Sequence, residues 1–242
     1  MRGLYDLSGV PLESFAFDKP YMVVGVIGCV FWAIAYVLAI RMNHVQKTYS
    51  LPAAAVCLNI GWETLTAFVF PDPLPLFQWF FVAWFLLDVV IVYQLFRFGP
   101  GEQPDPEVAR RFHAFLAGGI LLGLVGQWAF VAQYRDAFGF VAGFFINVLM
   151  SASFIFFYFA RRHTLRGISA GIAWTKMLGT MCTGYEAYFL LRVIDPSLQG
   201  RIAFFEFLWV AIALLDLYYV YLVTARPGAG TPASAAPEAR SA

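Results

Sequence analysis

Seven stretches of about 20 mainly apolar residues follow one another along this chain, and they constrain its fold more than any other feature. They cover residues 20–41, 52–70, 75–97, 111–133, 138–160, 168–192 and 202–224. A helix of this length crosses the hydrocarbon core of a bilayer and satisfies its own backbone hydrogen bonds there. The sequence therefore predicts an all-α membrane protein in which residues 1–225 form seven transmembrane helices.

The composition agrees with this fold, because 61% of the residues are hydrophobic and only 13% are charged. Soluble domains average about 25% charged residues. The net charge of +1 offers no basic surface, so we expect no nucleic-acid partner. Residues 226–242 are rich in Pro, Gly, Ala and Ser and have the composition of a disordered tail.

Lysine and arginine residues indicate the orientation, because they favour the cytoplasmic side of a membrane. With the N-terminus outside, the ten basic residues on the inner side are Arg41, Lys47, Arg97, Arg110, Arg111, Arg161, Arg162, Arg166, Arg226 and Arg240. The five on the outer side are Arg2, Lys19, Arg135, Arg192 and Arg201. We therefore predict an N-out, C-in topology.

Two short patterns occur twice in the same order. Gly-Trp-Glu at 61–63 is matched by Gly-Tyr-Glu at 184–186, and Leu-Leu-Asp at 86–88 recurs at 214–216. The offsets are similar, since 186 − 63 is 123 and 216 − 88 is 128. The first three and last three helices would then form a parallel repeat joined by the fourth helix, a 3+1+3 arrangement.

Each repeat unit places one Glu and one Asp inside a predicted span: Glu63, Asp88, Glu186 and Asp216. A carboxylate at the bilayer centre costs at least about 2.5–3.5 kcal/mol, so such groups are functional candidates. Glu63 and Asp216 lie within roughly 5 Å of the same depth, near the midplane. They are therefore predicted to face each other across a central cavity. Burial and mutual repulsion would keep one carboxyl protonated, as a general acid requires.

Polar and aromatic residues beside these acids are candidates for the cavity lining. They are Asn59, Trp62, Asp88, Tyr185, Glu186, Tyr218 and Tyr219. Asn59 stands one helical turn before Glu63 and can hydrogen-bond its carboxyl group, while the aromatic faces can stabilise a carbocation. In the alternative interpretation the acids are structural, and they lock the bundle by pairing with Lys176, Asn147, Gln127 or a tyrosine hydroxyl.

Several motifs are missing from the sequence. It contains no Asp-Asp-x-x-Asp cluster or other paired-acid motif suited to Mg²⁺ and diphosphate. It also has no His-Glu-x-x-His, Gly-x-Ser-x-Gly or Walker motif. The seventh helix lacks the lysine that a retinal Schiff base would need. We therefore expect no metal and no cofactor.

The segment Asn59-Ile60-Gly61-Trp62-Glu63 resembles the Asn-x-x-Trp-Glu signature of the small integral-membrane terpene cyclases. These include the pyripyropene-type meroterpenoid cyclases of fungi and the drimentine-type cyclases of actinobacteria. The chain length, the seven spans and the acid Asp216 on the last span agree with this family. The resemblance covers the chain except its tail.

This resemblance implies metal-independent cyclisation of a prenyl chain of farnesyl type on a lipophilic or meroterpenoid substrate. An acid protonates a terminal alkene or epoxide, the cation closes rings, and a base removes the last proton. The two essential acids of the family match Glu63 and Asp216, with acid and base unassigned between them. We expect an integral protein of a bacterial plasma membrane, in contact with lipid and with a prenylated small molecule.

Three other functions remain open at this point. A transporter would also place carboxylates at the midplane and would suit the repeat, although no proline lies well inside any span. A membrane isomerase would protonate a sterol-like alkene without forming a ring. A non-catalytic membrane scaffold would not explain why four acids lie inside the predicted spans.

Overall fold

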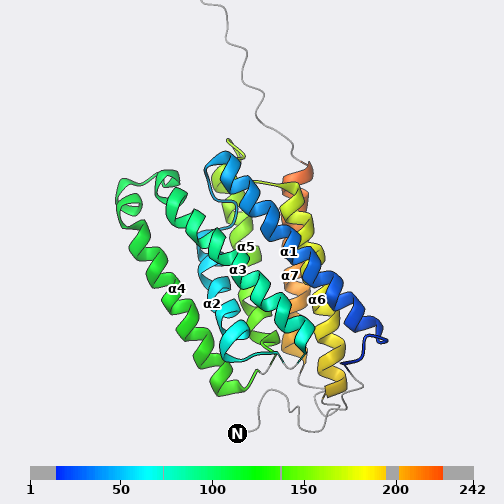
Figure 1. Ribbon diagram of the computed structural model, residues 1–242. Coiled ribbons are helices and arrows are strands. Elements are labelled where there is room, and N and C mark those ends of the chain that lie inside the picture. The colour runs from blue at the N-terminus through cyan, green and yellow to red at the C-terminus, as the bar shows by residue number, and fades with distance from the viewer. Residues whose placement is uncertain (1–14, 73, 137, 195–201, 226–242) are drawn as a thin grey trace, which may run out of the picture.

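The computed structural model describes residues 15–72, 74–136, 138–194 and 202–225. These residues form seven α-helices and no strand, so the predicted all-α fold is confirmed. The helices are α1 (Pro20–Gln46), α2 (Ala53–Thr64), α3 (Pro75–Phe98), α4 (Pro106–Tyr134), α5 (Phe140–Arg161), α6 (Ala170–Ile194) and α7 (Ala203–Ala225). They run up and down in one bundle (Figure 1), and each coincides with one predicted run. The predicted tail, 226–242, lies outside the described residues.

Proline marks the first turn of three helices, at Pro20, Pro75 and Pro106, where the missing N–H would have no helical partner. Asp105 caps α4, since its side chain accepts hydrogen bonds from the backbone N–H groups of Glu107 and Val108. Two helices change pitch at their C-terminal ends. α2 continues into the π-helical turn η2 (Leu65–Val69), and α3 continues into the 3₁₀ turn η3 (Gly99–Glu102).

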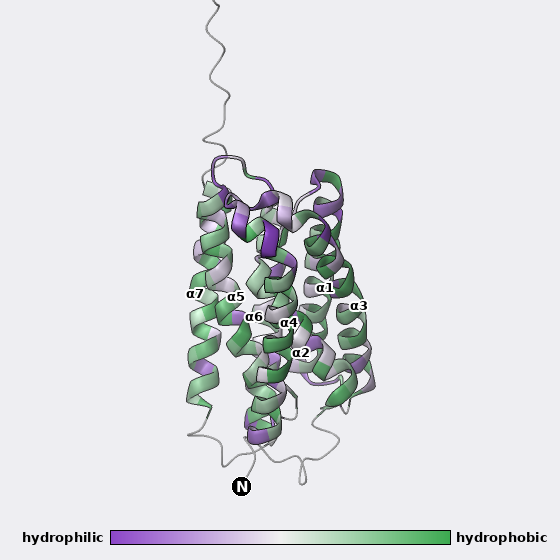
Figure 2. Ribbon diagram, turned by 90° about the vertical axis from the view of Figure 1, so that its left-hand side faces the viewer, coloured by the Kyte–Doolittle hydropathy of each residue, from purple (hydrophilic) through white to green (hydrophobic). Residues whose placement is uncertain are grey.

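Five of the described helices, α1, α3, α4, α5 and α7, are long and apolar enough to cross a membrane. α2 with η2 is a shorter apolar helix, Ala53–Val69. α6 is not among these five, and it carries Lys176 and Glu186, whose side chains are both buried inside the bundle. Figure 2 shows mostly hydrophobic residues along the helices and hydrophilic ones gathered at the end of the bundle where α7 ends. The N-out orientation stays a prediction.

The helix contacts come in matching pairs. α1 packs on α3 as α5 packs on α7, and α2 packs on α3 as α6 packs on α7. α1 also packs on α6, and α5 on α2. Two related three-helix units would give these contacts, although the repeat itself stays a prediction.

α4 lies at the edge of the bundle (Figure 1) and is held there chiefly by α2. A Cβ atom at Gly61 would lie 2.9 Å from the backbone nitrogen of Leu124, so the two helix backbones touch. Glycine is required at this position, two residues before Glu63, because any side chain would push α2 away from α4.

Candidate active site

Four buried polar side chains from three helices form a hydrogen-bonded cluster around Glu63. The hydroxyl of Tyr36 (α1) donates to Glu63 Oε1 at 2.5 Å, and Asn59 Nδ2 lies 2.9 Å from the same oxygen. Asn59 Nδ2 also lies 2.6 Å from Tyr36 Oη and 3.3 Å from Oδ2 of Asp88 on α3. The structure thus joins three predicted site residues, Glu63, Asn59 and Asp88, and adds Tyr36.

This cluster contains two carboxyl groups and no cation. Neither Glu63 nor Asp88 forms a salt bridge with a described residue, and both residues are 0% exposed. Glu63 Oε2 and Asp88 Oδ1 have no hydrogen-bond partner within the described ranges. Asn59 Nδ2 carries two hydrogens, whereas three acceptor oxygens, on Tyr36, Glu63 and Asp88, lie within hydrogen-bond distance. It cannot donate to all three at once. Charge repulsion and burial disfavour ionisation of both carboxyl groups at once. One of the two carboxyl groups therefore remains protonated.

The local sequence explains how Glu63 is presented. Asn59 and Glu63 are one helical turn apart and share a face of α2. Directly after Glu63 the helix widens into η2, where Thr66 Oγ1 donates to the Trp62 carbonyl at 3.0 Å. Thr64 Oγ1 donates to the Ile60 carbonyl at 2.6 Å. Such side-chain bonds to the preceding turn bend a helix, and π-turns occur frequently at functional sites.

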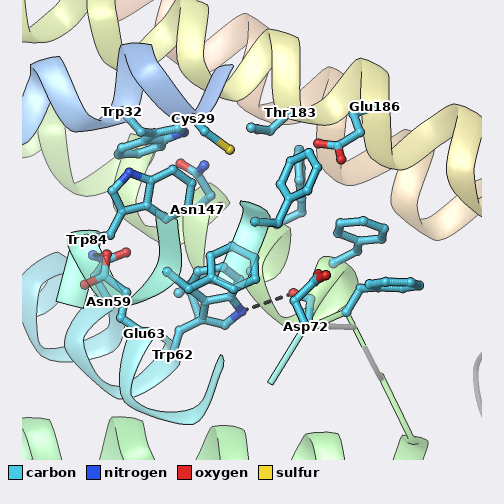
Figure 3. Close-up of a pocket in the computed structure, with 18 of the residues that line it drawn as sticks. Cys29, Trp32, Asn59, Trp62, Glu63, Asp72, Trp84, Asn147, Thr183 and Glu186 are labelled. Carbon is cyan, nitrogen blue, oxygen red and sulfur yellow. Dashed lines mark hydrogen bonds between the residues drawn. The ribbon is translucent and has the colours of Figure 1, made fainter. Parts of the chain in front are cut away.

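Glu63 and Asn59 lie in the wall of a pocket inside the bundle (Figure 3). Its empty space is about 840 Å³, part of which opens to the outside. The aromatic lining residues are Trp32, Tyr36, Trp62, Phe77, Phe81, Trp84, Phe138, Phe140 and Phe144. The pocket therefore offers an apolar substrate many π-faces and a carboxyl group in one wall.

Trp62 is fixed against this wall by contacts with the start of α5. Its indole Nε1 donates to the Gly139 carbonyl at 3.1 Å, the dashed line in Figure 3. A Cβ atom at Gly143 would lie 3.1 Å from the indole ring, so glycine leaves room for it. Phe81 meets the ring edge-on, with ring centres 5.4 Å apart. The predicted lining residue Trp62 is thus part of the pocket and has one defined position.

Two further acids, Asp72 and Glu186, line the same pocket. Glu186 on α6 is a predicted lining residue and is 4% exposed. Asp72 lies in the loop between η2 and α3, where its Oδ1 accepts a hydrogen bond from the Leu74 backbone at 2.7 Å. Burial raises the pKa of the Asp72 carboxyl from 3.8 to about 6. Asp72 thus changes charge near neutral pH.

The structure does not bring Asp216 to Glu63. Asp216 is paired with Lys176 of α6, whose Nζ lies 2.7 and 2.9 Å from its two carboxylate oxygens. Lys176 also donates to Ser151 Oγ on α5 at 2.8 Å. Asp216 is not among the residues that line the pocket. Similar depth in the membrane did not place the two acids together, because depth leaves the rotation of each helix undetermined. The arrangement matches the structural alternative, in which Lys176 pairs with a buried acid.

Four predicted lining residues, Asp88 of the Glu63 cluster and three tyrosines, are not among the residues that line the pocket. Tyr219 is buried beside the Asp216 pair and packs on Phe154, with ring centres 5.1 Å apart. Tyr218 is 45% exposed on the outside of the bundle. Tyr185 packs on Phe189 with ring centres 4.7 Å apart. Adjacency in sequence to an acid did not predict these positions, because successive residues of a helix point about 100° apart.

The sequence analysis missed Tyr36 and Asp72. Tyr36 is one of many aromatic residues in an apolar run, and nothing in the sequence relates it to Glu63, 27 residues away. Asp72 stands between two prolines, a pattern typical of a turn. The signal in the sequence that could have identified Asp72 as a site residue was its place in a short loop close to the end of the Glu63 helix.

No three His, Cys, Asp or Glu side chains in the described part of the chain gather closely enough to hold a metal ion. The expectation that activity needs no metal or cofactor stays a prediction.

Comparisons with known proteins identify the family to which the chain belongs. Residues 5–225 match the family of Pyr4-like transmembrane terpene cyclases. The chain is 30% identical over 200 residues to the Pyr4-family terpene cyclase mfmH of Annulohypoxylon moriforme, covering 78% of this chain and 80% of that protein. It is 32% identical over 157 residues to the terpene cyclase macJ of Penicillium terrestre, covering 63% and 60%. The terpene cyclase cle7 of Aspergillus versicolor is 26% identical over 194 residues, covering 78% and 79%. No solved structure shows a significant match.

These relatives are fungal proteins. The expectation of a bacterial plasma membrane therefore has no support from them and is not carried forward. The family and the apolar helices support a protein integral to a membrane.

Proposed function

The chain belongs to the Pyr4-like transmembrane terpene cyclases, and from this premise we propose that it cyclises a farnesyl-type prenyl chain by proton transfer from Glu63. The prenyl chain is carried on a lipophilic, meroterpenoid-type molecule. The reaction uses no metal and proceeds through a carbocation. The observation that carries this proposal is a buried carboxyl group in the wall of an aromatic pocket, with no counter-cation among the described residues.

Glu63 is suited to be the proton donor. Oε1 is held by Tyr36 and Asn59, so the unpartnered Oε2 is the oxygen that carries the proton. Asp88, linked to Glu63 through Asn59, disfavours ionisation of Glu63 by charge repulsion. Glu63 therefore enters the reaction as a neutral acid and leaves it as a carboxylate that Tyr36 and Asn59 stabilise.

The aromatic lining is suited to the cation that follows. Protonation of a terminal alkene or epoxide leaves a positive charge on carbon, which moves along the chain as rings close. Trp62, Phe81 and Trp84 present a continuous aromatic surface to it, with Phe81 and Trp84 ring centres 5.6 Å apart. A desolvated cation–π contact is worth about 2 kcal/mol. Because a neutral substrate gains little from it, this contact lowers the barrier more than it strengthens substrate binding.

The test is product formation by membranes that contain the protein. The membranes are incubated with a farnesylated phenol, a farnesylated indole and the terminal epoxide of each. We expect one of them to yield a cyclic product of unchanged mass, since one proton enters and one leaves. Membranes without the protein are the control. Uptake or release of intact substrate with no isomeric product in any case would contradict the proposal and favour transport.

A further inference from the structure

Glu186 on α6 has a nearly buried carboxyl group without a partner. No hydrogen bond or ion pair joins it to another residue in the ranges that the structure describes. Gly25 on α1 lies so close that a Cβ atom at position 25 would overlap Glu186 Oε2, so the glycine makes room for this carboxyl. An uncompensated acid inside a membrane costs at least about 2.5 kcal/mol. Since Glu186 is bonded to no described residue, a role in locking the helices does not account for it.

Glu186 lies across the pocket from Glu63. Figure 3 shows Glu63 and Asn59 on one side of the pocket and Glu186 and Asp72 on the other. Rings of the aromatic lining lie between these two sides. The pocket thus has a carboxyl group at each end of an apolar interior.

Asp72 can connect this second side of the pocket with water. It is half-buried in a loop at the end of the helices, and only its Oδ1 is fixed, by the Leu74 backbone N–H. No described residue donates to its Oδ2. Its carboxyl group is therefore free to take up and release a proton at the edge of the pocket.

We infer that Glu186 is the base that removes the last proton from the cyclised carbocation, and that Asp72 passes this proton on to water. The inference rests on the proposed function. Glu63 gives its proton to the terminal alkene carbon, or to the epoxide oxygen as its C–O bond breaks. Ring closure uses the next π-electron pair. Glu186 then takes a proton from a carbon beside the cation, and that C–H electron pair becomes the new double bond.

The direction of cyclisation explains why the base is not Glu63 itself. Each ring closure moves the positive charge along the prenyl chain, away from the end that was protonated. Glu186, in the opposite wall, is then nearer to the final cation than Glu63, which has already given up its proton. It also removes the proton before water adds to the cation, which would give an alcohol instead of an alkene.

The first test compares Glu186→Gln with Glu186→Asp and with the matched control Glu206→Gln. Glu206 lies in the first turn of α7 and does not line the pocket. With the substrate that the wild type cyclises, Glu186→Gln should still consume substrate within a few-fold of the wild-type rate. The normal alkene should fall by about a hundredfold, the usual effect of losing a general base, and be replaced by alcohols or misplaced alkenes. Glu186→Asp should recover part of the normal product, and Glu206→Gln all of it.

Two outcomes of this test overturn the inference. An unchanged product pattern in Glu186→Gln would exclude Glu186 as the base, and so would a complete stop of substrate consumption in a folded protein. Both leave the proposed function standing. The proposed function itself would be contradicted by a different result, namely that the wild type forms no ring product.

A second measurement needs no turnover. N,N-dimethyldodecylamine is an apolar chain with a protonated amine and resembles the cation in charge. Its affinity for the purified protein should fall about thirtyfold in Glu186→Gln, as expected when a buried charge loses its partner. Affinity should be unchanged in Glu206→Gln. Equal affinity in Glu186→Gln and wild type would contradict a carboxylate that faces the cation.

Discussion

The first and last three helices each bury an acid cluster, and the two clusters differ in charge balance. In the Glu63 cluster, two carboxyl groups share one asparagine amide and no described cation pairs with them. In the Asp216 cluster, Lys176 binds both carboxylate oxygens. Asp88 and Asp216 hold equivalent places in the predicted repeat, yet of the two only Asp216 has a counter-ion among the described residues.

This difference separates a proton donor from a structural pair. A carboxylate held by an ammonium group is stable in its charged form and has no proton to give. Glu63 and Asp88, which share one amide and pair with no described cation, retain at least one proton between them. Lys176 also lies over the ring of Trp32, 5.7 Å from its centre, and Trp32 lines the pocket. We therefore assign the Asp216 cluster a positioning role at the pocket wall.

The largest effect on stability is expected for Asp216→Asn. This change leaves the Lys176 ammonium buried and unpaired, which should cost about 3–5 kcal/mol. Product formation should fall together with stability, because the support of Trp32 is lost. Thermal unfolding in detergent micelles measures the first effect and membrane assays the second. An unchanged unfolding temperature with lost activity would return Asp216 to the catalytic pair that the sequence predicted.

Removing the charges of both Lys176 and Asp216 tests whether the Asp216 cluster, unlike the Glu63 cluster, has only a structural role. The double variant Lys176→Met, Asp216→Asn should regain most of the lost stability, because no buried charge remains without a partner. It should also regain part of the activity. A stable double variant that forms no product would show that the charges themselves are needed for the reaction.

A smaller effect is expected for Trp62→Leu, which keeps apolar bulk and removes a π-face beside Glu63. The rate should fall about thirtyfold, with a much smaller change in KM, because the contact is made to the cation only. Trp128→Leu is the matched control, since Trp128 is 51% exposed on α4. Equal kinetics in the two variants would remove Trp62 from the cation path.

The fold and part of the site could be predicted from the sequence. Helix positions follow from apolar runs, and the bond between Asn59 and Glu63 follows from their spacing of one helical turn. Contacts between helices could not be predicted in this way. Whether Lys176 faces Asp216, and Tyr36 faces Glu63, depends on helix rotations that packing determines.

A modest pH effect is expected from Asp72. Its pKa of about 6 in the folded protein is above the ordinary 3.8, so folding favours the protonated form. Its contribution to stability is thus present below about pH 4 and is lost as the pH rises through about 6. Asp72→Asn keeps an acceptor for the Leu74 N–H and should stabilise the protein more at pH 8 than at pH 5. The difference in unfolding temperature between wild type and variant at the two pH values measures this. An equal difference at both would contradict it.

No effect is expected from metal removal, because neither acid cluster is assigned a metal in the proposed reaction. Treatment with EDTA should leave the rate of product formation unchanged. Activity that disappears with EDTA and returns with Mg²⁺ would show that the initiating step is different.

The rate of ring formation by Glu63→Gln tests the assignment of the proton donor most directly. This change keeps the size and polarity of the side chain and removes the transferable proton. We predict a loss of about 100- to 10,000-fold with an unchanged unfolding temperature, while Glu206→Gln behaves like the wild type. Near-normal product formation by Glu63→Gln, at equal protein levels in the membrane, would contradict the assignment of Glu63 as the proton donor.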